Sequence, residues 1–253
     1  PPMAIRQDLI DDLCRELATH GDPERALGQQ RYMKSQMPYH GITSGELRRL
    51  LRPYLTAAPW HIAARADWED TVKSLWDNAT HREQRYAAQA LLGHRSYRAW
   101  HDPALLPLLE HLITTGAWWD HVDDLSGHHV GDILAHHRAA TTPTIRAWVT
   151  HEDLWLRRAS IICQLGHRAD TDLALLTDAI QANLEGSRHG SSFWIRKAIG
   201  WALRQHARTD PPLLLSHRRT IKVGFVAVSR LLAILVLVAC GSTHKPPAPS
   251  NDA

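Results

Sequence analysis

The chain has 253 residues, of which 44% are hydrophobic and 22% are charged, so neither an intrinsically disordered chain nor a fibrous repeat fits its bulk. Its net charge of +3 comes from the C-terminal end, because residues 213–253 carry five basic residues and one acidic residue. Residues 1–212 therefore hold 24 basic and 25 acidic residues. A body this close to neutral can bind a polyanion only if its positive charge is gathered on one face.

Residues 1–212 show a succession of helical patterns and no convincing strand alternation. The first predicted helix covers residues 5–17, where apolar side chains recur at helical spacing. Helix starts are also predicted at Ser44 and Thr142, where a hydroxyl side chain precedes helix-forming residues or proline. Three cysteines without metal-like or disulfide-like spacing favour a reducing, cytoplasmic compartment.

An internal repeat runs through this body. Residues 85–95 align with residues 158–168, since both open with Arg and close with Leu-Gly-His-Arg. A third copy begins at Arg196, so the period is about 37 residues, and a missing copy should start near His121. Periods near 40 residues built from helix pairs are typical of HEAT-like solenoids. We therefore expect an all-α, HEAT-like helical-repeat solenoid (an α-α superhelix) with a concave face over residues 1–212.

The missing copy differs from the other copies of the repeat at the third residue of the aligned segment. Ala87, Ser160 and Ala198 occupy that position in the other copies, whereas the missing copy has Asp123. The carboxylate is either an exposed exception or a functional group in the concave groove. Asp123 and Arg158 belong to adjacent copies and are 35 residues apart, so they should lie close together on one side of the solenoid.

Four blocks of sequence resemble the DNA alkylation repair (AlkD-like) glycosylases, which are HEAT-like repeat proteins. Residues 117–123 read AWWDHVD and resemble the family's WWDxVD signature. RYMK at 31–34, LWLRRA at 154–159 and FWIRKAIGWALR at 193–204 lie in the family's order. The resemblance spans roughly residues 5–210. It implies a monomeric DNA repair glycosylase that excises 7-alkylguanine and 3-alkyladenine from duplex DNA, without a cofactor and without a deep base pocket.

The resemblance also implies roles for individual residues. Asp123 would be the catalytic carboxylate, flanked by Trp119, with Trp201 as the second aromatic residue at the lesion. Arg158 would be the cation near the backbone of the scissile nucleotide. The implied DNA-binding residues are Tyr32, Lys34, Arg157, Arg196, Lys197 and Arg204.

These residue types suit that chemistry. A purine alkylated at N7 or N3 is cationic and already a competent leaving group, so the enzyme needs no strong general acid. One carboxylate can stabilise the oxocarbenium-like charge on the sugar and orient the attacking water. Tryptophan faces add cation–π attraction for the positive nucleotide.

Other aromatic and histidine residues admit simpler interpretations. We expect Trp118, Trp60, Trp68, Trp76, Trp100 and Trp148 to pack in the interior, whereas Trp155 and Trp194 could serve either role. His128, His129, His136 and His137 lack a carboxylate or cysteine that would complete a zinc pattern, so we expect no metal site. Two alternatives to the enzyme remain: a non-catalytic relative that grips distorted or branched DNA, and a scaffold for protein partners.

The end of the chain, residues 213–253, differs in character from the body. A basic start, an apolar stretch at 223–239 and the sequence Leu-Val-Ala-Cys have the layout of a bacterial lipoprotein signal peptide, which normally stands at an N-terminus. A gene fusion or frameshift explains this best, and a terminal helix closing the solenoid is the alternative. A membrane anchor is disfavoured, since 17 residues with an internal arginine fall short of the ~20 apolar residues that a bilayer requires.

Overall fold

The structure is a computed structural model, and it describes residues 5–209. These residues form helices and no strands, as the sequence predicts. The α-helices are α1 (Gln7–Thr19), α2 (Pro23–Met33), α3 (Ser44–Thr56), α4 (Arg65–Asp77), α5 (Arg82–Leu92), α6 (Leu106–Gly116), α7 (Trp119–Asp124), α8 (Gly131–His136), α9 (Arg138–Val149), α10 (Leu154–Ile162), α11 (Leu173–Gln181) and α12 (Phe193–Ala207). Short 3-10 helices lie at Ala58–Trp60, Arg95–Trp100, Pro103–Leu105 and Arg168–Asp170, and a π-helical turn at Leu125–Val130 joins α7 to α8.

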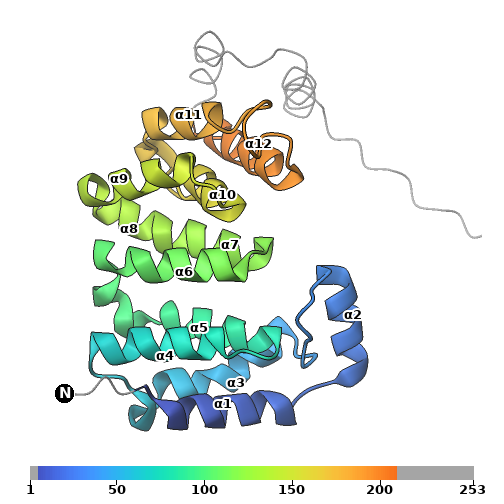
Figure 1. Cartoon of the computed structure of the whole chain (residues 1–253). Coiled ribbons are helices and arrows are strands. Elements are labelled where there is room, and N and C mark those ends of the chain that lie inside the picture. The colour runs from blue at the N-terminus through green and yellow to red at the C-terminus, as the bar shows by residue number, and fades with distance from the viewer. Residues whose placement is uncertain (1–4, 210–253) are drawn as a thin grey trace, which may run out of the picture.

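The helices stack in layers, with α1, α3, α4 and α5 at one end, α6, α7 and α8 in the middle, and α9 to α12 at the other end (Figure 1). Helix α2 stands apart, crosswise to the stack (Figure 1). The helices α5, α7, α10 and α12 begin at intervals of 37, 35 and 39 residues. This spacing confirms the predicted repeat, and α7 is the copy expected near His121.

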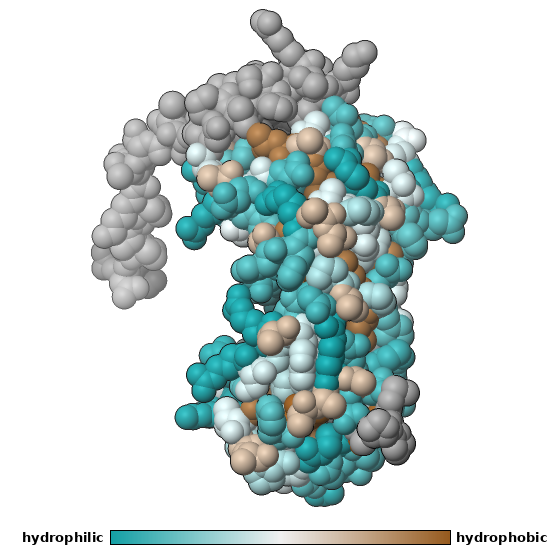
Figure 2. Space-filling model, turned by 90° about the vertical axis from the view of Figure 1, so that its left-hand side faces the viewer, coloured by the Kyte–Doolittle hydropathy of each residue, from teal (hydrophilic) through white to brown (hydrophobic). Residues whose placement is uncertain are grey.

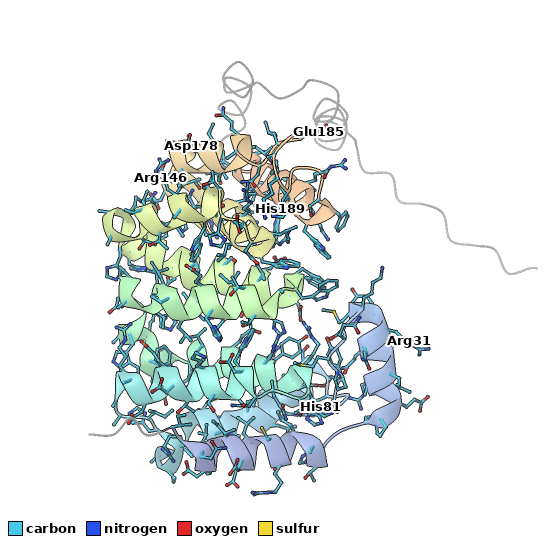
Figure 3. The ribbon with its side chains drawn as sticks, viewed as in Figure 1. Arg31, His81, Arg146, Asp178, Glu185 and His189 are labelled. Atoms are coloured by element: carbon cyan, nitrogen blue, oxygen red, sulfur yellow. The ribbon has the colours of Figure 1, made fainter. Side chains whose placement is uncertain are left out.

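Polar contacts between layers recur at the same sequence separation. Side chains 32 to 38 residues apart meet in the pairs Arg65–Asp102, Arg82–Asp120, Arg158–Asp123, Arg146–Asp178 and Arg188–Glu152. Figure 3 shows one of them, Arg146 and Asp178, at the edges of α9 and α11. One repeat along the chain is therefore one layer in space, as expected when each repeat packs on its neighbours.

Apolar side chains fill the space between the layers in two clusters. The larger extends from α1 to α11 and encloses Trp68, Trp76 and Trp148, while the smaller joins α10, α11 and α12. The predicted packing role of these three tryptophans is confirmed, and Trp60 and Trp100 lie partly buried against the larger cluster. Figure 2 shows a mostly hydrophilic side of the stack, hollowed between its lower and upper layers.

Two of the predicted helix starts are displaced. The predicted first helix is confirmed as α1, but α3 takes Thr43 rather than Ser44 as its N-cap, because Thr43 and Glu46 form a reciprocal capping box. The start predicted at Thr142 is wrong. Helix α9 begins at Arg138 and carries Pro143 in its interior.

Helix α2 is held at its C-terminal end. The buried Glu83 carboxylate accepts hydrogen bonds from the backbone N–H groups of His40, Gly41 and Ile42, in the loop that follows α2. The indole N–H of Trp118 donates to the carbonyl of Met33 at 2.9 Å. These bonds fix the end of α2 beside the middle layer.

No helix within residues 5–209 is long and apolar enough to cross a membrane. The atypical tail at 213–253, with its apolar stretch at 223–239, lies outside the residues that the structure describes. Its interpretation as a fusion, a closing helix or an anchor stays a prediction.

Candidate active site

The candidate catalytic carboxylate lies on the short helix α7. Trp119 opens this helix and Asp123 follows one turn later, so the two side chains share a face of α7. The Asp123 side chain keeps 18% of its surface exposed, and Trp119 is half-buried against the core. The helix therefore presents a carboxylate edge beside an indole.

Arg158 holds this carboxylate from the neighbouring helix α10. Its Nε and Nη2 atoms donate to the two oxygens of Asp123 at 2.7 and 2.8 Å, and its Nη1 donates to the carbonyl of Trp194 at 2.6 Å. The prediction that Asp123 and Arg158 lie close together is confirmed. The Arg158 side chain is only 1% exposed and has three internal acceptors. These contacts hold the Asp123 carboxylate in one orientation.

A cluster of three tryptophan rings adjoins this pair through Trp194. The rings of Trp118, Trp155 and Trp194 lie 5.4 to 6.2 Å apart, centroid to centroid. The Arg158 guanidinium lies 5.9 Å from the Trp194 ring. Trp155 and Trp194, whose role the sequence left open, therefore belong to the surroundings of the candidate site. A guanidinium among aromatic rings is desolvated, which strengthens its interaction with the Asp123 carboxylate.

Most of the remaining predicted residues lie on α12 or at the end of α2. Trp201, Arg196, Lys197 and Arg204 lie exposed on α12, the helix that also carries Trp194. Tyr32 is 80% exposed near the end of α2, where Lys34 caps the helix in a left-handed conformation with φ 51°.

Arg157 requires a correction. Its guanidinium points into the protein and donates to the backbone carbonyls of Thr150 and His151 and to Asn183. The side chain is buried and its donors are used, so Arg157 is not an accessible DNA contact. Adjacent arginines on a helix point about 100° apart, and Arg157 and Arg158 turn to different internal partners.

A second arginine–aspartate pair, which the sequence analysis missed, lies three residues before Asp123 on α7. Asp120 accepts hydrogen bonds from Arg82 and from the Tyr86 hydroxyl, both on α5. Arg82 is 5% exposed and Asp120 is 12% exposed. Burial raises the pKa of Asp120, but the nearby cations and the two hydrogen bonds outweigh burial and leave the pKa below its ordinary value. Burial and the Asp120 charge raise the pKa of Tyr86.

Buried histidines accompany this second pair. His121 is fully buried, and its Nδ1 lies 2.8 Å from the amide oxygen of Gln89. Burial lowers the pKa of His121 to about 3 and that of His129 to about 4, so both rings are neutral at neutral pH. Gln89 also donates to Asp124 at 2.9 Å, which continues the polar network between α5 and α7.

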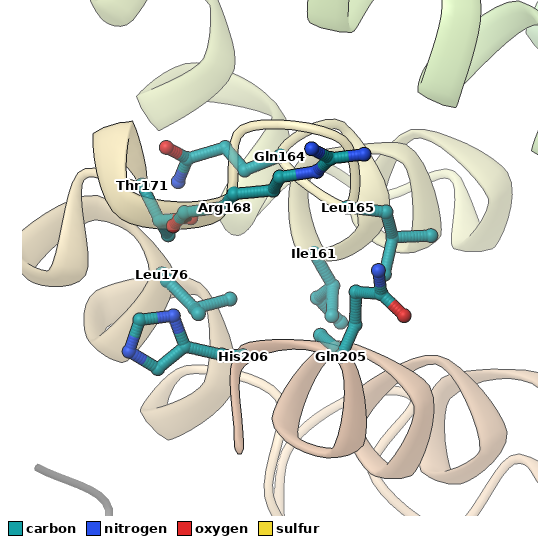
Figure 4. Close-up of a pocket in the computed structure, with 9 residues that line it drawn as sticks. Ile161, Gln164, Leu165, Arg168, Thr171, Leu176, Gln205 and His206 are labelled. Carbon is teal, nitrogen blue, oxygen red and sulfur yellow. Dashed lines mark hydrogen bonds between the residues drawn. The ribbon is translucent and has the colours of Figure 1, made fainter. Parts of the chain in front are cut away.

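Neither of two cavities in the described part of the chain contains Asp123. One, between α10, α11 and α12, has a volume of ≈10 Å³, enough for about one water molecule (Figure 4). The other is an open depression between α5 and α7, lined by Tyr86, Asp120, Asp124 and His128. Asp123, which is 18% exposed, lines neither of them. Residues 5–209 also contain no group of three His, Cys, Asp or Glu side chains arranged to hold a metal ion.

Comparisons with known proteins found a matching family and a similar solved structure. Residues 13–217 match the family of DNA alkylation repair enzymes, a range that includes every helix from α2 to α12. Among solved structures, one described as a predicted DNA alkylation repair enzyme from Enterococcus faecalis is similar, with 28% sequence identity and a TM-score of 0.66. The similarity covers 83% of this chain and 94% of that chain. No curated protein matches the chain.

Proposed function

The chain belongs to the DNA alkylation repair enzyme family, and from that premise we propose that it is a monofunctional DNA glycosylase acting on 7-alkylguanine and 3-alkyladenine in duplex DNA. The observation that carries this proposal is the Asp123–Arg158 pair. A bidentate arginine fixes the carboxylate, yet one side of it stays open to solvent beside tryptophans. Of the two α7 carboxylates paired with buried arginines, Asp123 is the more exposed, at 18% against 12% for Asp120.

The reaction needs little from the protein beyond this group. The N-glycosidic bond of a cationic purine breaks with its electrons going to the base, which leaves neutral and takes no proton. Positive charge builds on the deoxyribose, and Asp123 stabilises that charge. Water then bonds to C1′ and gives up one proton, for which a carboxylate oxygen is an acceptor.

The side chains around Asp123 have supporting roles. Arg158 acts as a positioning residue, because its planar fork restrains Asp123 to one rotamer. Trp119 and Trp201 offer aromatic faces to the sugar and to the cationic base, each contributing about 0.5–2 kcal/mol. The partly exposed Asp123 carboxylate suits a lesion approached within the duplex, without transfer of the base into a closed pocket.

The test is release of 7-methylguanine from methylated duplex DNA by the full-length chain. We expect release by the wild type and a loss of about 100-fold or more for Asp123→Asn. Asp120→Asn is the matched control, since it removes the same charge from the same helix and leaves another buried arginine without its partner. It should retain the wild-type rate per folded molecule.

Each result has a distinct meaning. No release by a wild type that binds DNA refutes the enzyme and favours a non-catalytic DNA-binding relative. Absence of both release and binding favours a protein scaffold. Equal release by wild type and Asp123→Asn refutes only the choice of carboxylate.

A further inference from the structure

The third aspartate of α7 lacks the arginine partner that the other two have. Asp120 and Asp123 each form an ion pair with a buried arginine from a neighbouring layer. Asp124 instead accepts hydrogen bonds from the Gln89 amide at 2.9 Å and from Nδ1 of the exposed His128 at 2.8 Å. No described arginine or lysine therefore balances the charge of this carboxylate.

Asp124 lines the open depression between α5 and α7. The depression has a volume of ≈510 Å³, within the usual range of ligand sites, and no described arginine or lysine lines it. Ala90 and Gly93, at the C-terminal end of α5, form part of its wall. The carbonyl end of a helix carries partial negative charge and attracts cations. An unbalanced carboxylate and a helix C-terminus thus face the same space.

A buried histidine lines this depression without a hydrogen-bond partner. The His129 side chain is 8% exposed, and its ring forms no hydrogen bond with another described residue. Oδ2 of Asp124 lies 4.0 Å from its Nε2, which is too far for a hydrogen bond. Burial lowers the pKa of His129 to about 4, so the ring is neutral at neutral pH and one nitrogen is an acceptor. A buried polar atom without a partner indicates that a bound group supplies one.

Packing fixes the position of this ring. A Cβ at Gly93 would lie 3.0 Å from Cε1 and 3.6 Å from Nε2 of His129, so the glycine leaves room for the imidazole. The corresponding glycine of the aligned copy, Gly166, has nothing within 4 Å of its Cβ position among the described residues. The ring of His101 lies 5.4 Å from that of His129, centroid to centroid. His129 is therefore held in place by its neighbours while its nitrogen stays unpaired.

We propose that this depression binds a primary alkylammonium ion, whose nitrogen donates hydrogen bonds to Oδ2 of Asp124 and to Nε2 of His129. Two hydrogen bonds of about 2.8 Å that meet at a tetrahedral nitrogen span about 4.6 Å, close to the observed 4.0 Å. A carboxylate oxygen accepts two hydrogen bonds, so the Gln89 amide stays bound. The alkyl stem contacts Ala90 on the α5 wall. This site goes beyond the proposed function, because neither acceptor takes part in the proposed reaction.

Other occupants match these two acceptors less well. Mg²⁺ and Ca²⁺ prefer oxygen ligands and leave the imidazole unused. Zn²⁺ takes imidazole but requires further protein ligands, and residues 5–209 offer no group of three suitable side chains. A water molecule bridges the same two atoms without balancing the charge of Asp124.

The probe is pentylammonium, titrated into the full-length chain at neutral pH and followed by calorimetry and by the nitrogen NMR signals of the histidine rings. Asp124→Asn and His129→Phe should each weaken the affinity by about tenfold or more, because each removes one acceptor. Pentyltrimethylammonium keeps the charge but has no N–H group. It should bind the wild type at least about tenfold more weakly.

Asp132→Asn is the matched control for loss of charge. Asp132 lies on the next helix, α8, where it pairs with Arg98, and it does not line the depression. Its replacement should leave the Kd for pentylammonium unchanged. Circular dichroism checks that each variant folds, and the comparison of the two ammonium ions on the wild type needs no variant.

The outcomes decide the proposal directly. Absence of saturable pentylammonium binding overturns it and leaves water as the bridge between Asp124 and His129. Equal affinity of wild type and Asp124→Asn, or of the primary and quaternary ions, overturns it as well. If the primary ion is preferred, diaminopentane compared with N-acetyl-lysine amide distinguishes a free amine from the lysine side chain of a partner protein. None of these measurements uses base release, so they stand or fall separately from the glycosylase.

Discussion

Helix α7 carries two aspartates three residues apart, and each forms an ion pair with a buried arginine from a neighbouring helix. Asp120 reaches back to Arg82 of α5, and Asp123 reaches forward to Arg158 of α10. The Tyr86 hydroxyl gives Asp120 a further hydrogen bond and leaves it 12% exposed, whereas Asp123 has Arg158 as its hydrogen-bond donor and is 18% exposed. A buried ion pair therefore marks no site by itself, and the two pairs differ in the additional Tyr86 donor on Asp120 and the aromatic neighbours of the Asp123–Arg158 pair.

The largest expected effect tests whether the pairs are equal in stability. Asp120→Asn and Asp123→Asn should each lower the free energy of unfolding by about 3–5 kcal/mol, because each leaves a buried arginine without its counterion. Urea denaturation followed by circular dichroism measures both. A loss below about 1 kcal/mol for Asp123→Asn alone would contradict this equality and mark its pair as strained for function.

Exchanging the arginines sharpens the comparison further. Arg158→Lys and Arg82→Lys should each cost about 1–3 kcal/mol, because an ammonium cannot reproduce a bidentate fork. Only Arg158→Lys should slow base release, by about tenfold, because Asp123 then loses its fixed orientation. Single-turnover rates of base release, measured together with urea denaturation of both variants, separate the effect on catalysis from the effect on stability. Equal slowing by both variants would show that α7 transmits any disturbance to the site.

Acid should lower the free energy of unfolding through the buried histidines near α5 and α7. The ordinary pKa of histidine is 6.5, and burial lowers that of His121 to about 3 and that of His129 to about 4. Between pH 6.5 and the lowered pKa of each histidine, the unfolded chain binds a proton there that the folded protein does not. The free energy of unfolding therefore has its full value above pH 6.5 and falls as the pH drops. Each histidine contributes a slope of up to about 1.4 kcal/mol per pH unit.

Unfolding free energies measured from pH 7 to pH 5 check this slope, and His121→Gln should flatten it. The glutamine supplies an amide donor toward Gln89 and does not titrate. An unchanged slope would assign the acid lability to other groups.

The smallest effect concerns the Tyr86 hydroxyl, which donates a hydrogen bond to Asp120. Tyr86→Phe removes one hydrogen bond to this carboxylate, and its loss should cost about 1–2 kcal/mol of stability. Base release per folded molecule should stay at the wild-type rate, since the Tyr86 hydroxyl bonds Asp120 and Tyr39 rather than Asp123. Slower release would instead place the Asp120 network within the catalytic site.

Repetition made the fold and the central pair predictable from sequence. The shared Leu-Gly-His-Arg ending gave the period, and the period placed Asp123 beside Arg158. The pair Arg82–Asp120 obeys the same spacing and was missed, although both residues lie near the start of neighbouring repeats. A search for opposite charges one period apart would have found it.

Side-chain direction was less predictable. The sequence could not tell that Arg157 turns inward, because a buried arginine depends on carbonyls from Thr150 and His151 that only the fold assembles. The start of α9 was misplaced because Pro143 signals a helix start in sequence, whereas the packed helix accommodates it.

The hydrogen bond from Trp118 to the Met33 carbonyl has a consequence for the order of folding. It spans 85 residues, more than twice the separation of the arginine–aspartate pairs that join successive layers. Contacts between neighbouring repeats close short loops and can form in succession, whereas this one closes a much longer loop and forms only when α2 reaches the middle layer. Helix α2 should therefore dock late, and variants at Trp118 should speed unfolding more than they slow folding.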